Sequence, residues 1–174
     1  MITDLVQIRL RTEENKRENK RFEKFVEANP REKRHFPRAA EIVEPKIDCR
    51  QCGECCRGAE ANVSRRDIQR LARFLRLKPS EFTRKYTMKG EGDDTILLRN
   101  DNTGCVFLKN KQCSVYEARP MTCRGFPHVS MSPQWVFDRL YSYPERASYC
   151  PIVYNWLETS KDLSGFKRSR DNKV

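Results

Sequence analysis

The stretch "CRQCGECCRG", residues 49–58, places four cysteines within eight positions. Thiols at this density occur in disulfide frameworks, in thiol redox sites and in metal centres. Cys49, Cys52 and Cys55 follow the spacing C-x2-C-x2-C, and Cys56 adds a directly adjacent thiol. A gap of two residues lets a tight turn direct two thiolates at one centre, and Gly53 permits the positive φ that such a turn often needs. The spacing therefore favours a metal centre.

The composition of the chain weighs against the other two kinds of site. Eight cysteines in 174 residues are roughly 5%, below the ~8–10% of disulfide scaffolds. A lone redox pair would use two cysteines and leave six without a role. No run approaches the ~20 apolar residues of a membrane helix, and the first twenty residues lack the apolar core of a signal peptide. We therefore expect a cytoplasmic protein with reduced thiols and no membrane association.

The spacing leaves the kind of metal open. Zinc takes four ligands and often uses C-x2-C pairs, whereas iron–sulfur clusters use C-x2-C-x2-C runs with a distant fourth cysteine. The C-x3-C-x2-C arrangement of radical enzymes is absent, because Ala59 stands at its third position. The remaining thiols lie downstream, at Cys105, Cys113, Cys123 and Cys150. Eight thiols suffice for two four-thiolate sites or for one site with spare thiols, and a buried structural cysteine is the alternative at each downstream position.

Three segments make the sequence resemble a known family: "CRQCGECCRG", "VSRRDIQRLARFLRLKPSEFTRKY" and "CVFLKNKQCSVYEARPMTCRGFP". They are similar to the CxxCxxCC cysteine-cluster (YkgJ-type) family, described as a zinc- or iron-chelating domain, from about residue 49 to residue 150. The resemblance implies chelation of zinc or iron, and the C-x2-C-x2-C spacing keeps a [4Fe–4S] cluster among the alternatives. The ligands that it implies are Cys49, Cys52, Cys55, Cys56, Cys105, Cys113, Cys123 and Cys150.

Arg57, Arg119 and Arg124 each lie within four residues of a cysteine, where a cation lowers the pKa of a thiol. Since the resemblance covers Arg119 and Arg124, we predict that both donate hydrogen bonds to sulfur. For Arg57 this role and that of an ordinary solvated arginine are equally consistent with the sequence. His128 follows Pro127 where the family more often has an apolar or aromatic residue, so it is either an added ligand or a surface histidine.

Periodicity predicts two main helices. Residues 3–29 are expected to form one helix with Thr3 as its N-cap, and its polar middle is expected to cross solvent. The clearest helix is 64–77, where Ser64 and Asp67 are spaced as a capping box. Its apolar residues share one face at ~100° per residue, while the opposite face is expected to be solvated. That face carries Arg65, Arg66, Arg70, Arg73 and Arg76.

Shorter elements follow in the second half of the chain. Ser80 is expected to cap a short helix that reaches Tyr86 and is anchored by Phe82. Residues 93–100 and 105–113 are predicted as a hairpin or as paired short strands. The segment 114–120 is predicted as a helical turn ended by its proline.

These elements predict a small, irregular α+β fold, mostly helical and stapled by metal, with a short β-hairpin and an N-terminal helical extension. Residues 1–47 are expected to form the N-terminal helix and a linker broken by Pro30, Pro37 and Pro45. Residues 48–155 are expected to form the cysteine-cluster domain, and residues 156–174 a basic tail.

The sequence is compatible with three classes of protein function. The first is a metal-binding module with a structural or electron-transfer role, and the second is an enzyme that uses the cluster, related to protein lysine methylation as the resemblance suggests. The third is a nucleic-acid adaptor held together by zinc, because residues 64–90 carry nine Lys or Arg against two acids. That basic segment equally suits an acidic protein partner or a solvated helix face. The glycines form no phosphate-cradling loop, and the sequence leaves open whether the chain is an enzyme.

Overall fold

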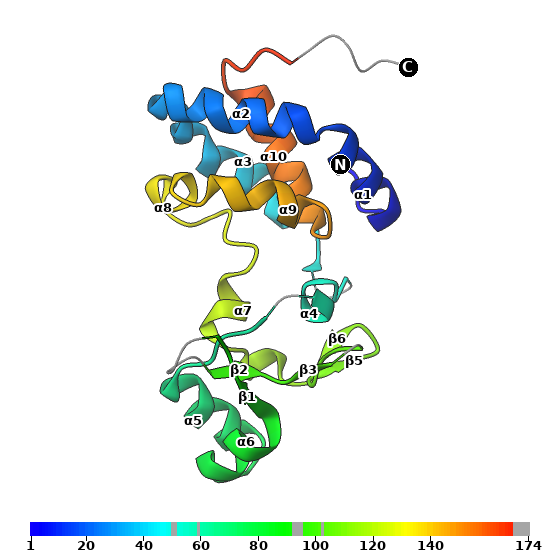
Figure 1. The fold of residues 1–174 in the computed structure, drawn as a ribbon, viewed down its shortest axis with the longest axis vertical. Coiled ribbons are helices and arrows are strands. Elements are labelled where there is room, and N and C mark those ends of the chain that lie inside the picture. Colours follow the sequence, from blue (N-terminus) through cyan, green and yellow to red (C-terminus); the bar gives the residue numbers. More distant parts are fainter. Residues whose placement is uncertain (50–51, 59, 92–95, 102, 169–174) are drawn as a thin grey trace. The chain divides into compact units, whose positions relative to one another are not determined.

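The computed structural model describes residues 1–49, 52–58, 60–91, 96–101 and 103–168. It confirms a mostly helical α+β fold with short antiparallel strands (Figure 1). The chain forms two compact units: a helical unit of Met1–Asp48 with Pro127–Val174, and a cysteine unit of Cys49–Phe126. Seven of the eight cysteines belong to the cysteine unit, and Cys150 belongs to the helical unit.

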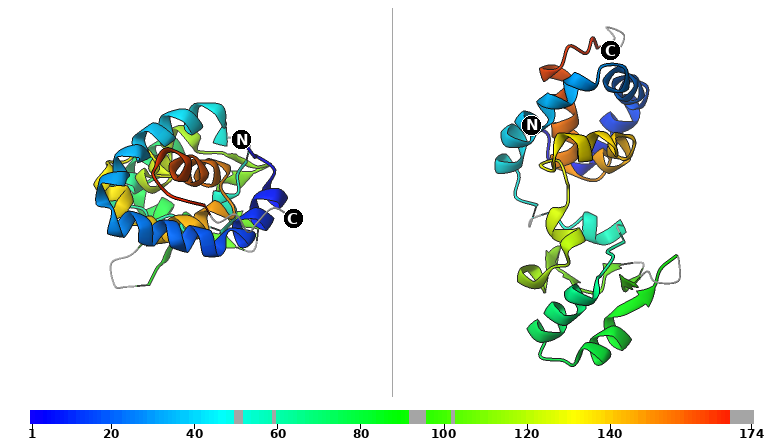
Figure 2. Two further views of the ribbon diagram at one scale, coloured as in Figure 1. Left: turned by 90° about the horizontal axis from the view of Figure 1, so that it is seen from above. Right: turned by 90° about the vertical axis from the view of Figure 1, so that its left-hand side faces the viewer.

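Helix α10 is the centre of the helical unit. The α-helices of this unit are α1 (Leu5–Glu14), α2 (Lys16–Ala28), α3 (Phe36–Val43), α8 (Pro133–Phe137), α9 (Tyr143–Ala147) and α10 (Pro151–Leu163). Short 3₁₀ helices occupy Pro30–His35, Glu44–Lys46 and Leu140–Ser142. Helix α10 contacts α1, α3 and α9, and it runs through the middle of these helices when seen from above (Figure 2, left). Because it is enclosed, α10 buries residues on every side.

Aromatic residues fill the core of the helical unit. The ring centre of Trp156 lies 5.1 Å from that of Phe36 and 4.9 Å from that of Tyr143. Trp156 Nε1 donates to the carbonyl of Phe36 at 3.1 Å, and Tyr143 Oη donates to the carbonyl of His128 at 2.9 Å. Buried Trp and Tyr need such partners for their polar ends. The Trp156 bond links α10 to α3, and the Tyr143 bond links α9 to the segment that precedes α8.

The N-terminal region differs from its prediction in three ways. The expected single helix is two helices, because the chain turns at Asn15. The N-cap is Asp4, which accepts a hydrogen bond from the Gln7 amide at 2.8 Å, and not Thr3. The polar middle does not simply cross solvent, since Thr12 and Asn19 are buried. Side chains that look solvated in the sequence are covered here because α1 and α2 pack on other helices of the unit.

The predicted linker contains the regular helix α3. Pro37 lies in its first turn, where a missing N–H costs no helical hydrogen bond. The helix buries Phe36, Ala39, Ala40 and Val43. Proline therefore marks a helix start at this position and not a break.

Part of the segment after Trp156 also packs within the helical unit. Lys161 is fully buried in α10, and its ammonium lies 2.8 Å from Glu18 and 2.6 Å from Glu158. The ring of Phe166 lies 5.3 Å from that of Phe22. Residues 156–163 thus belong to α10, although a tail was expected from residue 156 on. As limits of independently folding segments, the predicted boundaries stay a prediction.

The cysteine unit is built from four α-helices and three strand pairs in its described residues. The helices are α4 (Cys55–Gly58), α5 (Arg65–Phe74), α6 (Pro79–Tyr86) and α7 (Met121–Gly125), with a 3₁₀ helix at Tyr116–Ala118. The strands are β1 (Thr87–Lys89), β2 (Ile96–Leu98), β3 (Asn100–Asp101), β4 (Gly104–Cys105), β5 (Leu108–Lys109) and β6 (Gln112–Cys113). The pairs are β1–β2, β3–β4 and β5–β6, all antiparallel.

Helix α5 confirms the capping box predicted at Ser64 and Asp67. At its other end, Arg76 takes φ of +58° and the Leu77 amide donates to the Ala72 carbonyl at 2.9 Å. This 6→1 bond is the Schellman ending of a helix. The expectation of a uniformly solvated arginine face is wrong at Arg70, which is half-buried and paired with a carboxylate.

Two details of the shorter elements also differ from prediction. Helix α6 ends at Tyr86 with Phe82 buried, as predicted, but its N-cap is Lys78 and not Ser80. Pro79 sets this start because its fixed φ suits the first helical position. Strand β2 pairs with β1, which follows α6 directly, and not with residues 105–113. Residues 93–95 of the predicted strand lie outside the described residues.

The two predicted segments pair where Asn100 lies opposite Cys105 in β3–β4, and β5–β6 forms a hairpin within residues 105–113. Leu108 pairs with Cys113, and the two turn residues Asn110 and Lys111 have φ of +49° and +65°. Two consecutive residues with positive φ form the type I′ turn, whose twist matches that of the strands. The core beside the hairpin includes Phe107 and Phe82, whose ring centres lie 6.2 Å apart.

Candidate metal centre

Backbone hydrogen bonds join described residues of the cysteine-rich loop. The amide of Cys52 donates to the carbonyl of Cys49 at 3.2 Å, and the amide of Cys56 donates to the carbonyl of Gly53 at 3.1 Å. Gly53 has φ of +68°, which confirms the conformation expected of it. Cys55 is the first residue of α4, so both adjacent cysteines lie in the first turn of that helix.

Two glycines bring this loop against the segments that carry the downstream thiols. A Cβ on Gly53 would lie 2.7 Å from the carbonyl oxygen of Lys111, in the turn that precedes Cys113. A Cβ on Gly104 would lie 2.8 Å from the carbonyl oxygen of Cys56. Since both neighbours are backbone atoms, the close approach requires glycine at each position. The loop therefore packs on β4 and on the β5–β6 turn.

Each downstream thiol of the cysteine unit is held by regular structure. Cys105 ends β4 opposite Asn100, and Cys113 ends β6 opposite Leu108. Both cysteines pack against the hydrophobic core of the unit. Cys123 lies in the middle of α7. Strand pairing, core packing and helix α7 thus determine the positions of these three thiols.

The thiols of the unit influence one another electrostatically. The pKa of Cys105 is raised to about 11 and that of Cys123 to about 12, mainly by burial and to a smaller extent by the thiolate of Cys56. A hydrogen bond with Cys55, followed by burial, raises the pKa of Cys56 itself. Burial also raises the pKa values of Cys52 and Cys113, with a smaller contribution from Cys56. Cys56 therefore shares one region with five other thiols, and their thiolates repel one another unless a cation is present.

Arg119 is a cation in this region. Its charge lowers the pKa values of Cys56, Cys113 and Cys123, against the larger effect of burial. The guanidinium carbon lies 3.5 Å from the centre of the Tyr116 ring, and Nε donates to the Tyr116 carbonyl at 3.0 Å. Stacking on an aromatic ring holds an arginine in one direction, so Arg119 stabilises thiolates from a defined position.

Arg124 and Arg57 bind oxygen acceptors. Arg124 Nη2 donates to the carbonyl of Glu117 at 2.6 Å, and its Nε donates to the carbonyl of Arg119 at 3.1 Å. Arg57 pairs with Glu54 at 3.0 Å. Arg124 therefore orders the turn that precedes Cys123, and the predicted hydrogen bonds from Arg119 and Arg124 to sulfur stay a prediction.

Cys150 and His128 lie in the helical unit. Cys150 is buried at the N-cap of α10, and its amide donates to the carbonyl of Arg146 at 3.0 Å. The ring centre of His128 lies 5.3 Å from that of Trp135. Burial and the nearby guanidiniums of Arg146 and Arg139 lower the pKa of the His128 ring. His128 is thus half-buried against an aromatic side chain, which differs from an ordinary surface histidine.

None of the eight cysteines forms a disulfide in the structure. Across the described ranges, no group of three His, Cys, Asp or Glu side chains already has the arrangement of a metal site. The donor set nevertheless suits a soft metal, because clustered, half-buried thiols are the ligands of zinc and of iron–sulfur clusters. Sequence reasoning missed the role of Gly104, although a glycine directly before a cysteine was a usable signal. The assignment of individual ligands stays a prediction.

A small unit built around clustered thiols defines a class of cysteine-rich chelating domains. A model of the CxxCxxCC family, described as "Putative zinc- or iron-chelating domain", matches residues 48–151. That match spans more than half of the chain, and the chain belongs to this family.

A shorter part of the chain is similar to another protein. The uncharacterized protein MJ0661 of Methanocaldococcus jannaschii is 30% identical over 82 residues, which are 46% of this chain and 43% of that protein. The match thus spans less than half of that relative's length. No solved structure matches the chain significantly. Within the part of the chain that is described, none of the helices has the length and apolar character needed to cross a membrane.

Proposed function

We propose that the protein binds zinc or an iron–sulfur cluster through the thiolates of its cysteine unit, in a structural or electron-transfer role. The observation that carries the proposal is the close approach at Gly53 and Gly104. It packs the loop of four cysteines on the two strand pairs that hold Cys105 and Cys113. Membership of a family described as zinc- or iron-chelating supports the same function.

The thiols and Arg119 have different roles in the proposed metal site. The loop thiols form one wall of the proposed site, and Cys105, Cys113 and Cys123 form the other. One tetrahedral ion cannot readily bind all four loop thiols, because Cys55 and Cys56 are adjacent and crowd each other. The loop thiols are therefore divided between two metal centres or bind along one face of a cluster. Arg119 offsets part of the negative charge. When bound, the metal would crosslink the two walls or store an electron.

The compartment and partners are part of the same proposal. Thiols persist in reduced form in the cytoplasm, which is the compartment we propose. An acidic protein is the partner that suits the exposed arginines of α5, such as Arg66 and Arg73.

The test is purification without oxygen, followed by measurement of metal, of acid-labile sulfide and of the visible spectrum. We expect a bound metal: iron with sulfide and a coloured protein for a cluster, or zinc with a colourless protein for a structural site. A folded, monodisperse protein that contains neither metal would contradict the proposal.

The same measurements on serine variants test the two walls. We expect Cys52→Ser and Cys55→Ser to lower the metal content and the melting temperature, and Cys113→Ser and Cys123→Ser to do so to a similar degree, because each change opens the same closed site. Full metal content in Cys113→Ser and Cys123→Ser would show that the downstream segments do not share the site.

A further inference from the structure

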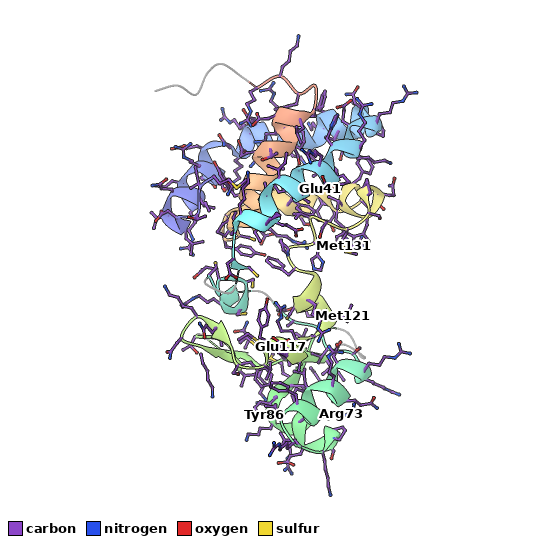
Figure 3. The ribbon with its side chains drawn as sticks, turned by 180° about the vertical axis from the view of Figure 1, so that it is seen from behind. Glu41, Arg73, Tyr86, Glu117, Met121 and Met131 are labelled. Carbon is purple, nitrogen blue, oxygen red and sulfur yellow. The ribbon has the colours of Figure 1, made fainter. Side chains whose placement is uncertain are left out.

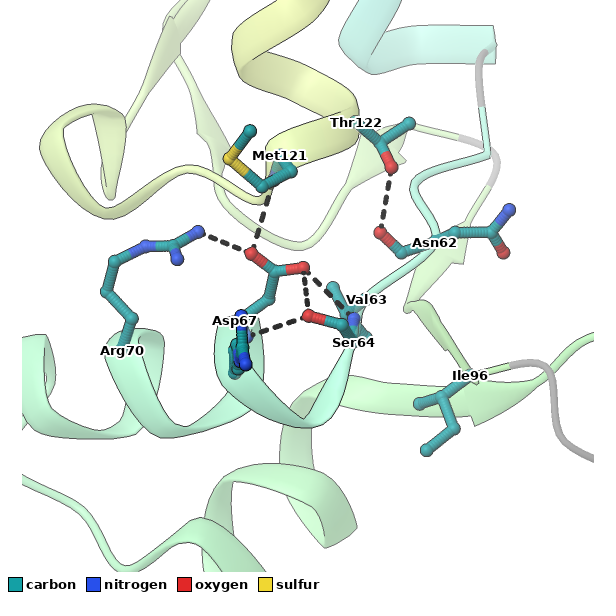
Figure 4. Close-up of a pocket in the computed structure, with 9 residues that line it drawn as sticks. Asn62, Val63, Ser64, Asp67, Arg70, Ile96, Met121 and Thr122 are labelled. Carbon is teal, nitrogen blue, oxygen red and sulfur yellow. Dashed lines mark hydrogen bonds and ion pairs between the residues drawn. The ribbon is translucent and has the colours of Figure 1, made fainter.

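A buried carboxylate at the start of α5 makes more contacts than helix capping requires. Asp67 Oδ2 accepts hydrogen bonds from the Ser64 amide at 3.0 Å and from Ser64 Oγ at 2.7 Å, which completes the capping box. Asp67 Oδ1 instead accepts from the amide of Met121 at 3.2 Å and from Arg70 Nη2. These contacts lie in a pocket of about 830 Å³ (Figure 4). One oxygen thus caps α5, and the other holds a segment 54 residues further along the chain.

Arg70 holds the same segment from a second point. Its Nη2 donates to the carbonyl of Arg119 at 2.7 Å as well as to Asp67. The carbonyl of Arg119 and the amide of Met121 flank Pro120, which has no N–H of its own. Asp67 and Arg70 therefore hydrogen-bond to the backbone on both sides of this proline. In addition, Thr122 Oγ1 donates to the Asn62 carbonyl at 3.2 Å.

The segment around Pro120 carries or adjoins two groups of the proposed metal centre. Arg119 is the cation whose charge reaches Cys56, Cys113 and Cys123. Met121, labelled in Figure 3, is the first residue of α7, and Cys123 follows two residues later. The peptide groups between them are held by side chains of α5, so the position of α7 depends on a helix that carries no thiol.

We propose that Asp67 and Arg70 are positioning residues of the metal centre, which fix the backbone from Arg119 to Met121 and thereby place Arg119 and Cys123. This inference rests on the proposed function. Hydrogen-bonded partners that orient metal ligands commonly contribute about 10–100-fold to metal affinity. The depressed pKa of Asp67 is consistent with a carboxylate surrounded by donors, which more than offset the opposing effect of burial.

Matched variants separate this role from helix capping. Ser64→Ala removes the cap but leaves Asp67 Oδ1 on Met121 and Arg70. Asp67→Ala removes the capping box and also the contacts of Oδ1 with Met121 and Arg70. Arg70→Gln removes the contact with Arg119 and leaves the capping box. Arg73→Gln changes an exposed arginine of the same helix and serves as the neutral control. Arg70→Lys keeps the charge without the two-acceptor geometry of a guanidinium.

The experiment is a Co²⁺ titration of the full, reduced chain, in which thiolate-to-metal absorption reports both the affinity and the ligand geometry. We expect Asp67→Ala and Arg70→Gln to weaken Co²⁺ binding about tenfold and to alter the spectrum. Arg70→Lys should lie between Arg70→Gln and the unchanged chain. We expect Ser64→Ala to lower the melting temperature with the affinity and spectrum retained, and Arg73→Gln to change neither.

Several outcomes would overturn the inference. Unchanged Co²⁺ affinity in Arg70→Gln would do so, even if Asp67→Ala failed to fold. Equal losses of affinity in Ser64→Ala and Asp67→Ala would assign the whole effect to helix capping. An unchanged chain that binds no Co²⁺, Zn²⁺ or iron would instead refute the proposed function, and with it the centre that these residues are inferred to position.

Discussion

Gly104 has no space for a side chain. Its φ of +117° is one that residues with a Cβ rarely adopt, and a Cβ would meet the carbonyl oxygen of Cys56 and the Cα of Arg57. Both neighbours are backbone of α4, which a substitution can relieve only by moving the cysteine-bearing helix. Glycine at this position therefore determines how closely Cys56 approaches Cys105.

We predict that Gly104→Ala destabilises the cysteine unit by about 1–3 kcal/mol, the usual cost of a strained backbone conformation, and lowers its metal content. Denaturant melts and metal analysis measure the two effects. Gly58→Ala is the matched control, because a Cβ there would have nothing within 4 Å. Equal behaviour of the two variants would show that the approach of α4 to β4 is not constrained by this glycine.

At the scale of elements, α5 has two roles on different faces. Ile68 and Leu71 bury the apolar face, and Arg70 turns to the segment that bears Arg119. Arg66 and Arg73 are exposed on the remaining surface. The arginines of this helix are thus not equivalent, and only the exposed ones are available to a phosphate or to an acidic protein.

We predict that Arg66→Gln with Arg73→Gln leaves melting and metal content nearly unchanged, since surface substitutions usually alter the free energy of unfolding by less than about 0.5 kcal/mol each. If the chain binds nucleic acid through α5, the double variant should also weaken that binding and reduce its salt dependence. Filter binding over a range of salt concentrations measures this. Absence of salt-dependent binding in the unchanged chain would remove the adaptor function.

At the scale of the whole molecule, the two units have cores of different kinds. The helical unit packs Phe36, Tyr143 and Trp156 around α10. The cysteine unit has a small core between α5, α6 and short strands, and the sheets in its described residues are two-stranded. Isolated two-stranded pairs are marginal in water, so we expect the cysteine unit to be the part whose stability depends on metal.

We predict that chelation of the metal loosens the cysteine unit and leaves the helical unit folded. Both tryptophans, Trp135 and Trp156, belong to the helical unit, so their fluorescence should stay native. Hydrogen exchange should accelerate in residues 60–91 and 103–126, because ligand binding contributes directly to the folding of such units. Simultaneous loss of tryptophan fluorescence and of protection in both units would indicate one cooperative fold.

The sequence by itself determined the local features of this protein. The capping box at Ser64, the positive φ of Gly53 and the hairpin ending at Cys113 follow from residues a few positions apart, whose steric and hydrogen-bonding preferences act without the rest of the fold. The cysteine spacing and the resemblance also led to the chelating family. Only the tertiary structure decided that Asp67 and Arg70 bind the segment before Cys123, that Gly104 faces Cys56, and that the polar residues Thr12 and Asn19 are buried. These contacts join positions far apart in the chain, where neither local propensity nor periodicity specifies which surfaces meet.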